Sequence, residues 1–289
     1  MPGPSTRVEF DADSIGARTD PERLAVTRES VTAYAAATND PIAAHLAGDL
    51  AAPLYAAVPV MPLIIEAAFL VAPPEAAIRV LHGEQDIRFH RLIVPGDQIT
   101  ATAQPLGFTG RPNGTAAAIC VESRDGVGEL VNEQYITLFF PKYDAGVTVG
   151  ALAPGHKFDE TLRAAAPAAV VTHHVDDDQT FRYAEASGDP NPVHTDPETA
   201  VASGLPGIIA HGLCSQAMTA WAAVAELAGG DSSRLRRHAV RFTKPVFPGQ
   251  DIVTTFWRRG SVDGVTSYQF ESAVDGVVVL RDGLAEIAD

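Results

Sequence analysis

The hydrophobic and polar positions follow the same order in the two halves of this chain. In the second half, residues 208–227 form a long, Ala-rich apolar run that ends at two consecutive glycines. A run of this length with a Gly-Gly stop favours a buried helix over a strand. The matching run in the first half is 61–72, and two prolines end it. We therefore expect one long apolar helix in each half.

Strand patterns dominate the chain after each of these runs. Pro-Gly and Asp-Gly pairs separate short stretches rich in β-branched and aromatic residues, as in antiparallel strands. One helix followed by several such strands predicts a sheet wrapped around the helix. The expected strands are 84–94, 98–108, 115–123 and 130–140 in the first half, and 238–247, 251–260, 266–274 and 277–287 in the second.

An internal duplication explains this common order. Residues 34–45 align without a gap with 183–194, and 87–97 align with 240–250. The halves therefore descend from one unit, and a segment rich in Ala, Gly and Pro separates them. The predicted organisation is an N-terminal repeat over 1–142, a linker over 143–170 and a C-terminal repeat over 171–289.

The stretch SGDPNPVHTD, residues 187–196, holds two titratable residues at a close spacing. Asp189 and His194 lie five positions apart, with two prolines between them. One interpretation is an ordinary turn, in which Asp196 caps the next helix. The other is a site in which a restricted backbone holds a carboxylate and an imidazole beside one water molecule. An imidazole suits such a site because its pKa lies near neutrality.

Neighbouring residues strengthen the second interpretation. Gly188 precedes the aspartate, and Asn191 adds a neutral donor and acceptor between the pair. The segment GLPGIIAHG, residues 204–212, leads into the long apolar run. Backbone N–H groups at the start of a helix can polarise a carbonyl as an oxyanion hole. Together these features indicate a catalytic site rather than a turn alone.

The segment YAEASGDPNPVHTDPETA (183–200), followed by IIAHGL (208–213), resembles the signature of the MaoC-like dehydratases, also called R-specific enoyl-CoA hydratases or hydratase 2. RFTKPVFPG (241–249) resembles the strand that follows the central helix in that family. The full-length duplication resembles the family's double hot-dog members, in which the second half keeps the signature. The resemblance implies an α+β, double hot-dog fold, in which two antiparallel sheets each wrap around a long central helix.

The resemblance also implies a hydro-lyase that adds water reversibly to a trans-2-enoyl thioester and gives the (3R)-3-hydroxyacyl product. Asp189 and His194 would activate the water and shuttle the proton, and Asn191 would help to position it. The backbone N–H of Gly212 would stabilise the enolate-like oxygen. Which of the pair is acid or base stays open, because a coupled pair titrates as a unit. No metal or redox cofactor is implied, and coenzyme A enters as part of the substrate.

Four further residues are expected to contact the substrate. One basic side chain after the long helix would meet a phosphate of coenzyme A. Strand alternation puts Arg241 and Lys244 on opposite faces, so at most one of them does so. The expected substrate-binding residues are Gly188, His211, Arg241 and Lys244.

The first half keeps Asp40 and His45 at the same spacing, but Ile42 stands at the position of the motif's asparagine. Aligning the halves sets Pro62 against Gly212, and proline has no N–H to donate. We therefore expect a non-catalytic first half that shapes a tunnel for the acyl chain.

Three alternatives remain open. The thiol carrier could be acyl carrier protein, as in fatty acid or polyketide synthesis, because the reacting atoms are the same. A thioesterase would use a carboxylate on the central helix, as Glu66 could supply, although the edge of an amphipathic helix is the preferred explanation of that residue. A non-catalytic acyl-thioester binding subunit is disfavoured by the intact Asp189, Asn191 and His194.

Composition and charge narrow the partners and the compartment. The 289 residues carry a formal net charge of -15, which disfavours nucleic acid and argues mildly against an acidic carrier protein. No signal peptide, membrane-spanning run or disulfide framework is apparent, so we expect a cytoplasmic protein. The pair His173-His174 beside three aspartates is interpreted as the approach to a helix, not as a metal site. A monomer and a homodimer both stay open.

Overall fold

The computed structural model describes residues 5–289, which form two compact units. The first unit comprises the chain up to Leu24 together with Pro59–Arg88 and Gln98–Gly155. The second unit comprises Ala25–Val58, Phe89–Asp97 and His156–Asp289. The units therefore do not coincide with the two repeats, and the second unit contains both copies of the duplicated Asp-to-His segment.

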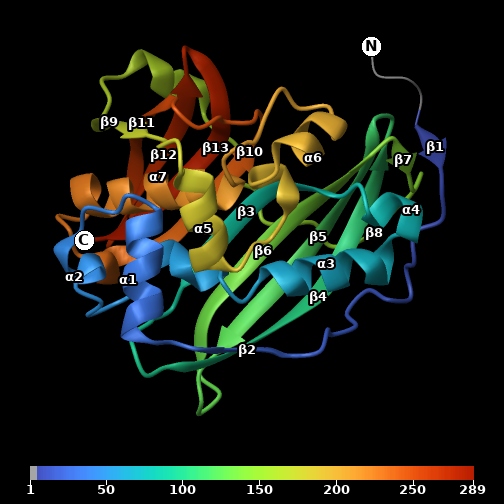
Figure 1. Ribbon diagram of the computed structural model, residues 1–289, viewed down its shortest axis with the longest axis horizontal. Coiled ribbons are helices and arrows are strands. Elements are labelled where there is room, and N and C mark those ends of the chain that lie inside the picture. The colour runs from blue at the N-terminus through green and yellow to red at the C-terminus, as the bar shows by residue number, and fades with distance from the viewer. Residues whose placement is uncertain (1–4) are drawn as a thin grey trace. The chain divides into compact units, whose positions relative to one another are not determined.

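An antiparallel sheet and one long helix build the first unit. Its elements are β1 (Thr6–Arg7), β2 (Glu22–Ala25), α3 (Met61–Val71), α4 (Pro74–Ala77), β3 (Leu81–Phe89), β4 (Gln98–Arg111), β5 (Gly114–Arg124), β6 (Leu130–Pro141), β7 (Tyr143–Asp144) and β8 (Thr148–Gly150). The strand order is β2-β4-β5-β6-β3, β8 pairs with β4, and β1 pairs with β7. Helix α3 packs on β4 and β5, as Figure 1 shows. This is the helix-and-sheet unit that the sequence predicts.

The second unit repeats this plan with more helices. Its elements are α1 (Arg28–Ala37), α2 (Ala43–Leu46), η1 (Pro53–Ala57), η2 (Glu160–Ala164), β9 (Ala169–His174), α5 (Gln179–Ser187), η3 (Pro192–His194), α6 (Pro197–Ala202), α7 (Gly212–Leu227), η4 (Ser232–Arg234), β10 (Leu235–Phe242), β11 (Asp251–Val262), β12 (Val265–Val274) and β13 (Val277–Ala288). The strand order is β10-β13-β12-β11-β9, and each neighbouring pair in it is antiparallel. Helix α7 contacts β9, β10 and β13 and is the central helix of this unit.

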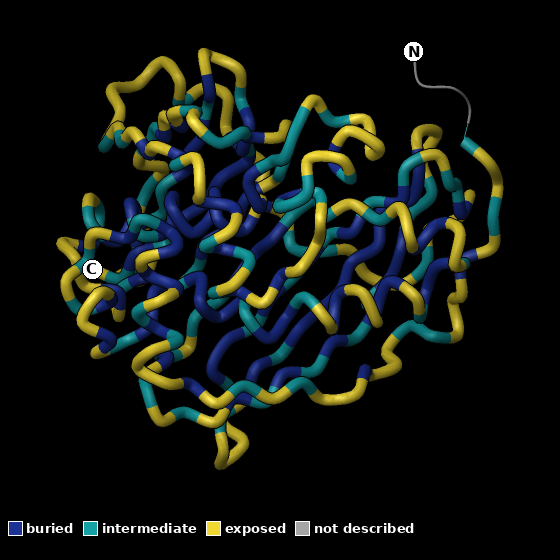
Figure 2. The backbone as a smooth tube through the Cα atoms, viewed as in Figure 1, coloured by how far each residue is buried: buried dark blue, intermediate teal, exposed yellow. Residues whose placement is uncertain are grey.

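Helix α7 is buried along most of its length, as the dark segments in Figure 2 illustrate. Its many alanines let the backbone approach the sheet closely, so residues such as Ala222 and Ala223 are fully buried. The helix ends where Gly230, with φ +84°, donates its N–H to the carbonyl of Val224 at 2.9 Å. The Gly-Gly stop in the sequence therefore has a direct structural cause.

A polar cluster interrupts this apolar core. The side-chain nitrogens of His238 on β10 lie 3.3 Å from Gln216 and 3.3 Å from Thr219, both on α7. Burial lowers the pKa of His238 to about 3, and nearby His156 adds to the effect. His238 is therefore neutral, and its hydrogen bonds fix the position of α7 on the sheet.

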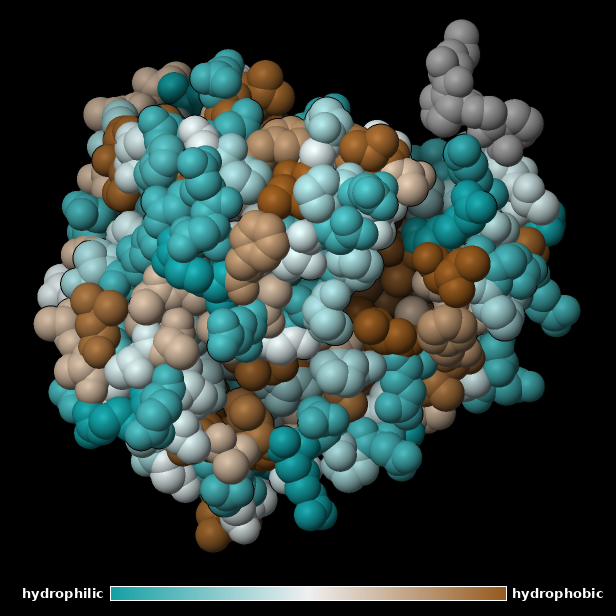
Figure 3. All heavy atoms as spheres, viewed as in Figure 1, coloured by the Kyte–Doolittle hydropathy of each residue, from teal (hydrophilic) through white to brown (hydrophobic). Residues whose placement is uncertain are grey.

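Helix α3 leaves part of its apolar surface uncovered within the first unit. Ile65 and Phe69 on its outer side are 51% and 48% exposed. Figure 3 shows hydrophobic side chains gathered over the part of this face where α3 lies. Across residues 5–289, no helix combines the length and hydrophobicity needed to cross a membrane.

Several expectations from the sequence need adjustment. Strand β10 ends at Phe242, so strand alternation does not extend to Lys244, and both Arg241 and Lys244 are exposed. The prediction that they lie on opposite faces of one strand is therefore wrong. The central helix begins at Gly212 rather than 208, because the preceding residues form an extended turn. The segment 143–170 contains β7, β8 and η2 as well as irregular chain.

Candidate active site

Gly188 ends helix α5 and directs the chain toward Asp189. It adopts φ +72°, a left-handed conformation that glycine adopts without strain, and its N–H donates to Ala184 at 3.0 Å. Ser187 accepts the N–H of Asp189 on its hydroxyl at 3.3 Å. A Cβ atom at Gly188 would meet no heavy atom within 4 Å, so the glycine is needed for its conformation and not for space.

A tight turn then places the carboxylate and the imidazole. The N–H of Asn191 donates to Oδ1 of Asp189 at 3.1 Å, and Oδ1 of Asn191 accepts the N–H of Val193 at 3.3 Å. The short helix η3 follows and ends at His194. Asn191 therefore shapes the turn with its backbone and side chain, and its side chain is exposed.

His194 is largely buried, and a hydrogen bond in the plane of its ring holds it. Its Nδ1 lies 2.8 Å from the carbonyl oxygen of Ile209. Because a carbonyl only accepts, Nδ1 carries the proton, and Nε2 of the neutral ring is left as the acceptor. Burial lowers the pKa of His194, although the Ile209 carbonyl and Asp189 act in the opposite direction. The ring is therefore a neutral base at neutral pH.

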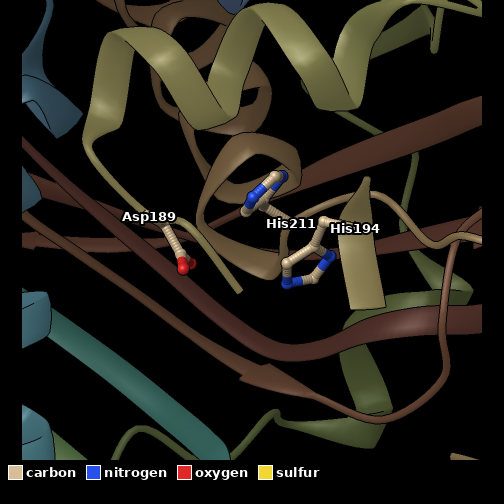
Figure 4. A group of neighbouring side chains, drawn as sticks. All are labelled: Asp189, His194 and His211. Atoms are coloured by element: carbon tan, nitrogen blue, oxygen red, sulfur yellow. The ribbon is translucent and has the colours of Figure 1, made fainter. Parts of the chain in front are cut away.

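His211 completes a compact group with Asp189 and His194. One side-chain ligand atom from each of the three lies within 4.8 Å of the others. The two imidazoles stack, with ring centroids 3.7 Å apart and planes 27° apart. Figure 4 shows the two rings next to each other, with Asp189 beside them. A metal ion binds a histidine through a lone pair that lies in the plane of the ring. In two nearly parallel, stacked rings these lone pairs lie in separate planes and do not meet at one point. One ion could bind both rings only after one of them turned, so the arrangement favours a stacked pair over a metal centre.

The N-terminus of α7 supplies free backbone donors next to this group. His211 is the N-cap, its side chain does not cap the helix, and the helix begins at Gly212. The first N–H groups of any helix lack intrahelical acceptors. Gly212 is exposed, and a Cβ atom there would lie 3.1 Å from two carbons of the Phe242 ring. Glycine thus leaves room for the Phe242 ring at the start of the helix.

The segment after β10 runs alongside the start of α7. The N–H of Ala210 donates to the carbonyl of Val246 at 2.8 Å, and Phe242 packs at Gly212. Lys244 lies between these two contacts in the sequence and is exposed. Its position therefore fits a role at the edge of the site. Arg241 is exposed one residue before Phe242, on β10 itself.

The duplicated pair Asp40 and His45 is enclosed. Oδ2 of Asp40 lies 2.7 Å from Nδ1 of His45, and Nε2 of His45 lies 2.8 Å from the hydroxyl of Ser232. Both members of the pair have completely buried side chains. Both ring nitrogens of His45 therefore have protein partners, and neither side chain of the pair is exposed.

Asn39 occupies in the first copy the position that Gly188 holds in the second. It also adopts a positive φ, +52°, and its side-chain amide donates to Asp176 at 3.0 Å and to Gln179 at 2.9 Å. These bonds tie the end of α1 to the start of α5. The turn beside Asp189 has glycine at this position and therefore makes no such side-chain bonds.

Other residues singled out in the sequence have structural surroundings. Glu66 is exposed on α3 and accepts the backbone N–H of Asp20 at 3.2 Å, as expected for the edge of an amphipathic helix. Arg88, which aligns with Arg241 in the duplication, lies over the ring of Tyr135, 4.9 Å from its centroid. The first-half helix begins at Met61, and Pro62, which the sequence alignment sets against Gly212, lies in its first turn and has no N–H.

Two family matches divide the chain between them. Residues 159–278 match the MaoC like domain, and residues 13–133 match the FAS1-like dehydratase domain region. Among curated relatives, 3-hydroxyacyl-thioester dehydratase Y of Mycobacterium tuberculosis is 31% identical over 96% of this chain and 98% of its own. Probable enoyl-CoA hydratase 2 of Dictyostelium discoideum is 28% identical over 72% of this chain and 70% of its own.

Solved structures confirm the expected fold. A MaoC-like dehydratase from Phytophthora capsici has a TM-score of 0.83 at 24% identity, covering 96% of this chain and 99% of that one. A Mycobacterium tuberculosis protein described as a double hot-dog has a TM-score of 0.63 at 15% identity, covering 92% of this chain and 93% of that one. At these identities the similarity establishes the fold alone.

Proposed function

This chain belongs to the family of MaoC-like dehydratases, and we propose that it adds water reversibly to trans-2-enoyl thioesters, giving (3R)-3-hydroxyacyl thioesters. The observation that carries the proposal is the convergence of Asp189, the free Nε2 of His194 and the helix start at Gly212. These are the three things the reaction needs: a carboxylate, a neutral base and a donor for developing negative charge.

The roles follow from the chemistry of conjugate addition. A water molecule attacks carbon 3 while a proton reaches carbon 2, and negative charge builds on the thioester oxygen. Asp189 and His194 hold the water, remove its proton and deliver one to carbon 2; the group that is base in hydration is acid in dehydration. The N–H of Gly212 stabilises the enolate-like oxygen. The addition of water involves no net oxidation or reduction, so it calls for no redox cofactor, and in this proposal Asp189, His194 and the N–H of Gly212 supply the proton transfer and the charge stabilisation without a metal.

We further propose coenzyme A as the thiol carrier. The Dictyostelium relative is named an enoyl-CoA hydratase. The formal net charge of -15 opposes docking of an acidic carrier protein, whereas a single exposed lysine suffices for one phosphate. Lys244 has that exposure and lies in the segment beside the start of α7.

Cys120 and Cys214 are both buried and free, which agrees with a reducing compartment such as the cytoplasm.

The first repeat would then serve the acyl chain. The uncovered apolar side of α3, with Ile65 and Phe69, offers the type of surface that an acyl chain buries favourably. Asp40 and His45 are enclosed and take no part in the proposed chemistry.

The test follows the loss of enoyl-thioester absorbance with crotonyl-CoA and with a longer trans-2-enoyl-CoA, and then determines the configuration of the product on a chiral column. The proposal expects hydration to the (3R) product only. Lys244→Glu should raise KM for the coenzyme A thioester and leave KM for the same acyl pantetheine thioester, which lacks the nucleotide phosphates, unchanged. Turnover of carrier-protein thioesters alone would favour acyl carrier protein. Inactivity on every thioester would contradict the proposal.

A further inference from the structure

His211 is a polar residue in an apolar setting. Its ring is 2% exposed, and across residues 5–289 neither of its nitrogens finds a hydrogen-bond partner. One face lies on the ring of His194, and Tyr183 borders it with ring centroids 4.9 Å apart. The backbone carbonyl of Asp189 is close enough to act on the pKa of His211, but neither ring nitrogen has a hydrogen bond of ordinary geometry. Burying the two nitrogens in this way is costly, so the contacts of the ring faces are the ones that hold the side chain.

The stack restrains the motion that the hydrogen bond of His194 leaves free. The bond from Nδ1 to the Ile209 carbonyl fixes one edge of the His194 ring but still allows the ring to tilt about it. A flat ring at a centroid distance of 3.7 Å blocks that tilt from one side and keeps water from that face. The hydrogen bond and the stack together define the direction of Nε2.

We propose that His211 is a positioning residue that acts through His194. Its flat, uncharged ring stacks on one face of the catalytic imidazole and so holds that imidazole in position. The inference rests on the proposed function for the catalytic role of His194, and it replaces the expectation that His211 contacts the substrate. It concerns the ring face of His211 and assigns no role to its nitrogens.

The groups around the pair keep the plate neutral. Burial and, to a smaller extent, the adjacent His194 lower the pKa of His211 to about 3, and the carbonyl of Asp189 acts against this. From α5, Tyr183 has a raised pKa because it is buried, and burial also raises the pKa of Cys214 on α7 to about 12. Asp189 is therefore the acidic group that acts on His194. At neutral pH no positive charge on His211 competes with the proton that His194 must accept.

Two substitutions separate the ring from its nitrogens. His211→Phe keeps a flat plate and removes both nitrogens, whereas His211→Ala removes the plate and admits water. Because a small displacement of a catalytic group can cost two orders of magnitude, we expect kcat of His211→Ala to fall about 100-fold while KM changes little. We expect kcat of His211→Phe to stay within about threefold of the unaltered protein. If the alanine variant does not fold, His211→Leu replaces it in the test. Leucine fills the space without a flat face, so this variant should show the loss of kcat that we expect for His211→Ala.

His173 offers a matched control elsewhere in the same unit. It is buried, both of its nitrogens lack partners among residues 5–289, and its ring meets that of Trp221 with centroids 4.8 Å apart. Burial lowers its pKa to about 4. His173→Ala and His173→Phe should therefore reproduce any general effect of altering a buried histidine, and they should leave kcat and its pH dependence unchanged.

An NMR titration of the His194 ring without substrate tests the inference independently of activity. The His194 signal is assigned by its absence in His194→Asn. The titration midpoint should rise toward the ordinary value in His211→Ala, because water then reaches the ring, and stay low in His211→Phe. In a His194→Asn background, His211→Ala should cause no further loss of activity, since it acts through the missing ring.

The outcomes distinguish the two proposals. If the protein is inactive on every thioester, the proposed function is overturned. If the titration midpoint of His194 nevertheless rises in His211→Ala and not in His211→Phe, the stacking role is supported. Equal losses in His211→Phe and His211→Ala, or a raised KM with unchanged kcat, would overturn the inference and assign the nitrogens to substrate. An unchanged His194 midpoint in His211→Ala would also overturn it.

Discussion

The hydroxyl oxygens of Tyr34 and Tyr183 lie 3.3 Å apart, although the residues are 149 positions apart in the chain. They occupy equivalent positions in the two repeats and are both fully buried. Tyr34 donates its single hydroxyl proton to the carbonyl of Leu54 at 3.0 Å, so Tyr183 must be the donor between them. The ring of Tyr183 in turn borders His211. The duplicated segments thus meet through matching residues directly behind the site.

This direction of donation predicts unequal effects of two matched substitutions. Tyr34→Phe leaves the Leu54 carbonyl without its donor and the Tyr183 hydroxyl without its acceptor, so we expect a loss of about 2 kcal/mol in the free energy of unfolding. Tyr183→Phe leaves only a lone pair of Tyr34 unused and should cost about 1 kcal/mol. Urea unfolding of the two variants measures the difference. A larger loss for Tyr183→Phe would show that the hydrogen bond runs the other way.

The enclosed pair of the first copy should matter for stability and not for turnover. Ser232→Ala removes the partner of His45 Nε2 in a buried setting, which should cost about 1–3 kcal/mol of unfolding free energy. We expect kcat/KM for crotonyl-CoA to stay within about twofold, because neither side chain of the pair reaches solvent. If Ser232 were instead a nucleophile activated by His45 and Asp40, the activity would disappear in Ser232→Ala. A fluorophosphonate reagent would then block the activity of the unaltered protein.

The glycine at the start of α7 can be tested without removing its N–H. Gly212→Ala places a Cβ atom 3.1 Å from the Phe242 ring, which must shift or push the helix start away. We expect a loss of about tenfold in kcat, since the N–H moves relative to the thioester oxygen. Combining it with Phe242→Leu, which removes the ring, should restore part of the loss. If the double variant were no better than Gly212→Ala, the contact with Phe242 would not be the cause.

Buried histidines should make the protein sensitive to acid. Burial lowers the pKa values of His173, His211 and His238 to about 4, 3 and 3, from an ordinary value of 6.5. Below pH 6.5 the unfolded chain therefore binds protons that the folded chain does not, so stability falls as pH decreases, until the folded protein also protonates near pH 3–4. Each histidine contributes about 1.4 kcal/mol per pH unit within that window.

A single substitution checks this sign. His173→Phe should reduce the loss of unfolding free energy between pH 7 and pH 5 by about 2 kcal/mol, because one proton-linked group is removed. Denaturant unfolding at the two pH values measures it. An undiminished loss in His173→Phe would mean that His173 binds its proton equally in both states.

The site residues that the sequence predicts are those set by local chain geometry. Gly188, Asp189, Asn191 and His194 lie within seven consecutive positions, so a turn with fixed prolines brings them together without help from distant contacts. The apolar run and the glycines that end it also predict the long helix, although they place its start at 208 and the structure places it at Gly212. The duplication supplied the remaining information by showing that each half builds the same helix-and-sheet unit.

Contacts between segments that lie far apart in the chain could not be predicted from the sequence. Ser232 lies 187 residues from His45, and nothing near it distinguishes it from other serines in a turn. The stacking of His211 on His194 depends on how the start of α7 meets η3, which no periodicity encodes. Lys244 was misplaced because Thr243 and Lys244 come after the end of β10, where alternation no longer applies.

The most direct measurement compares equivalent carboxylates of the two copies. Asp189→Asn and Asp40→Asn change the same atoms at repeat-equivalent positions, and kcat/KM for hydration of crotonyl-CoA is measured for both, with the melting temperature of each. We expect Asp189→Asn to lose about 100- to 10,000-fold, as for removal of a general acid or base, with its fold intact. Folded Asp40→Asn should retain activity within about threefold. Comparable losses in both variants, or full activity in Asp189→Asn, would contradict a single hydratase site in the second copy.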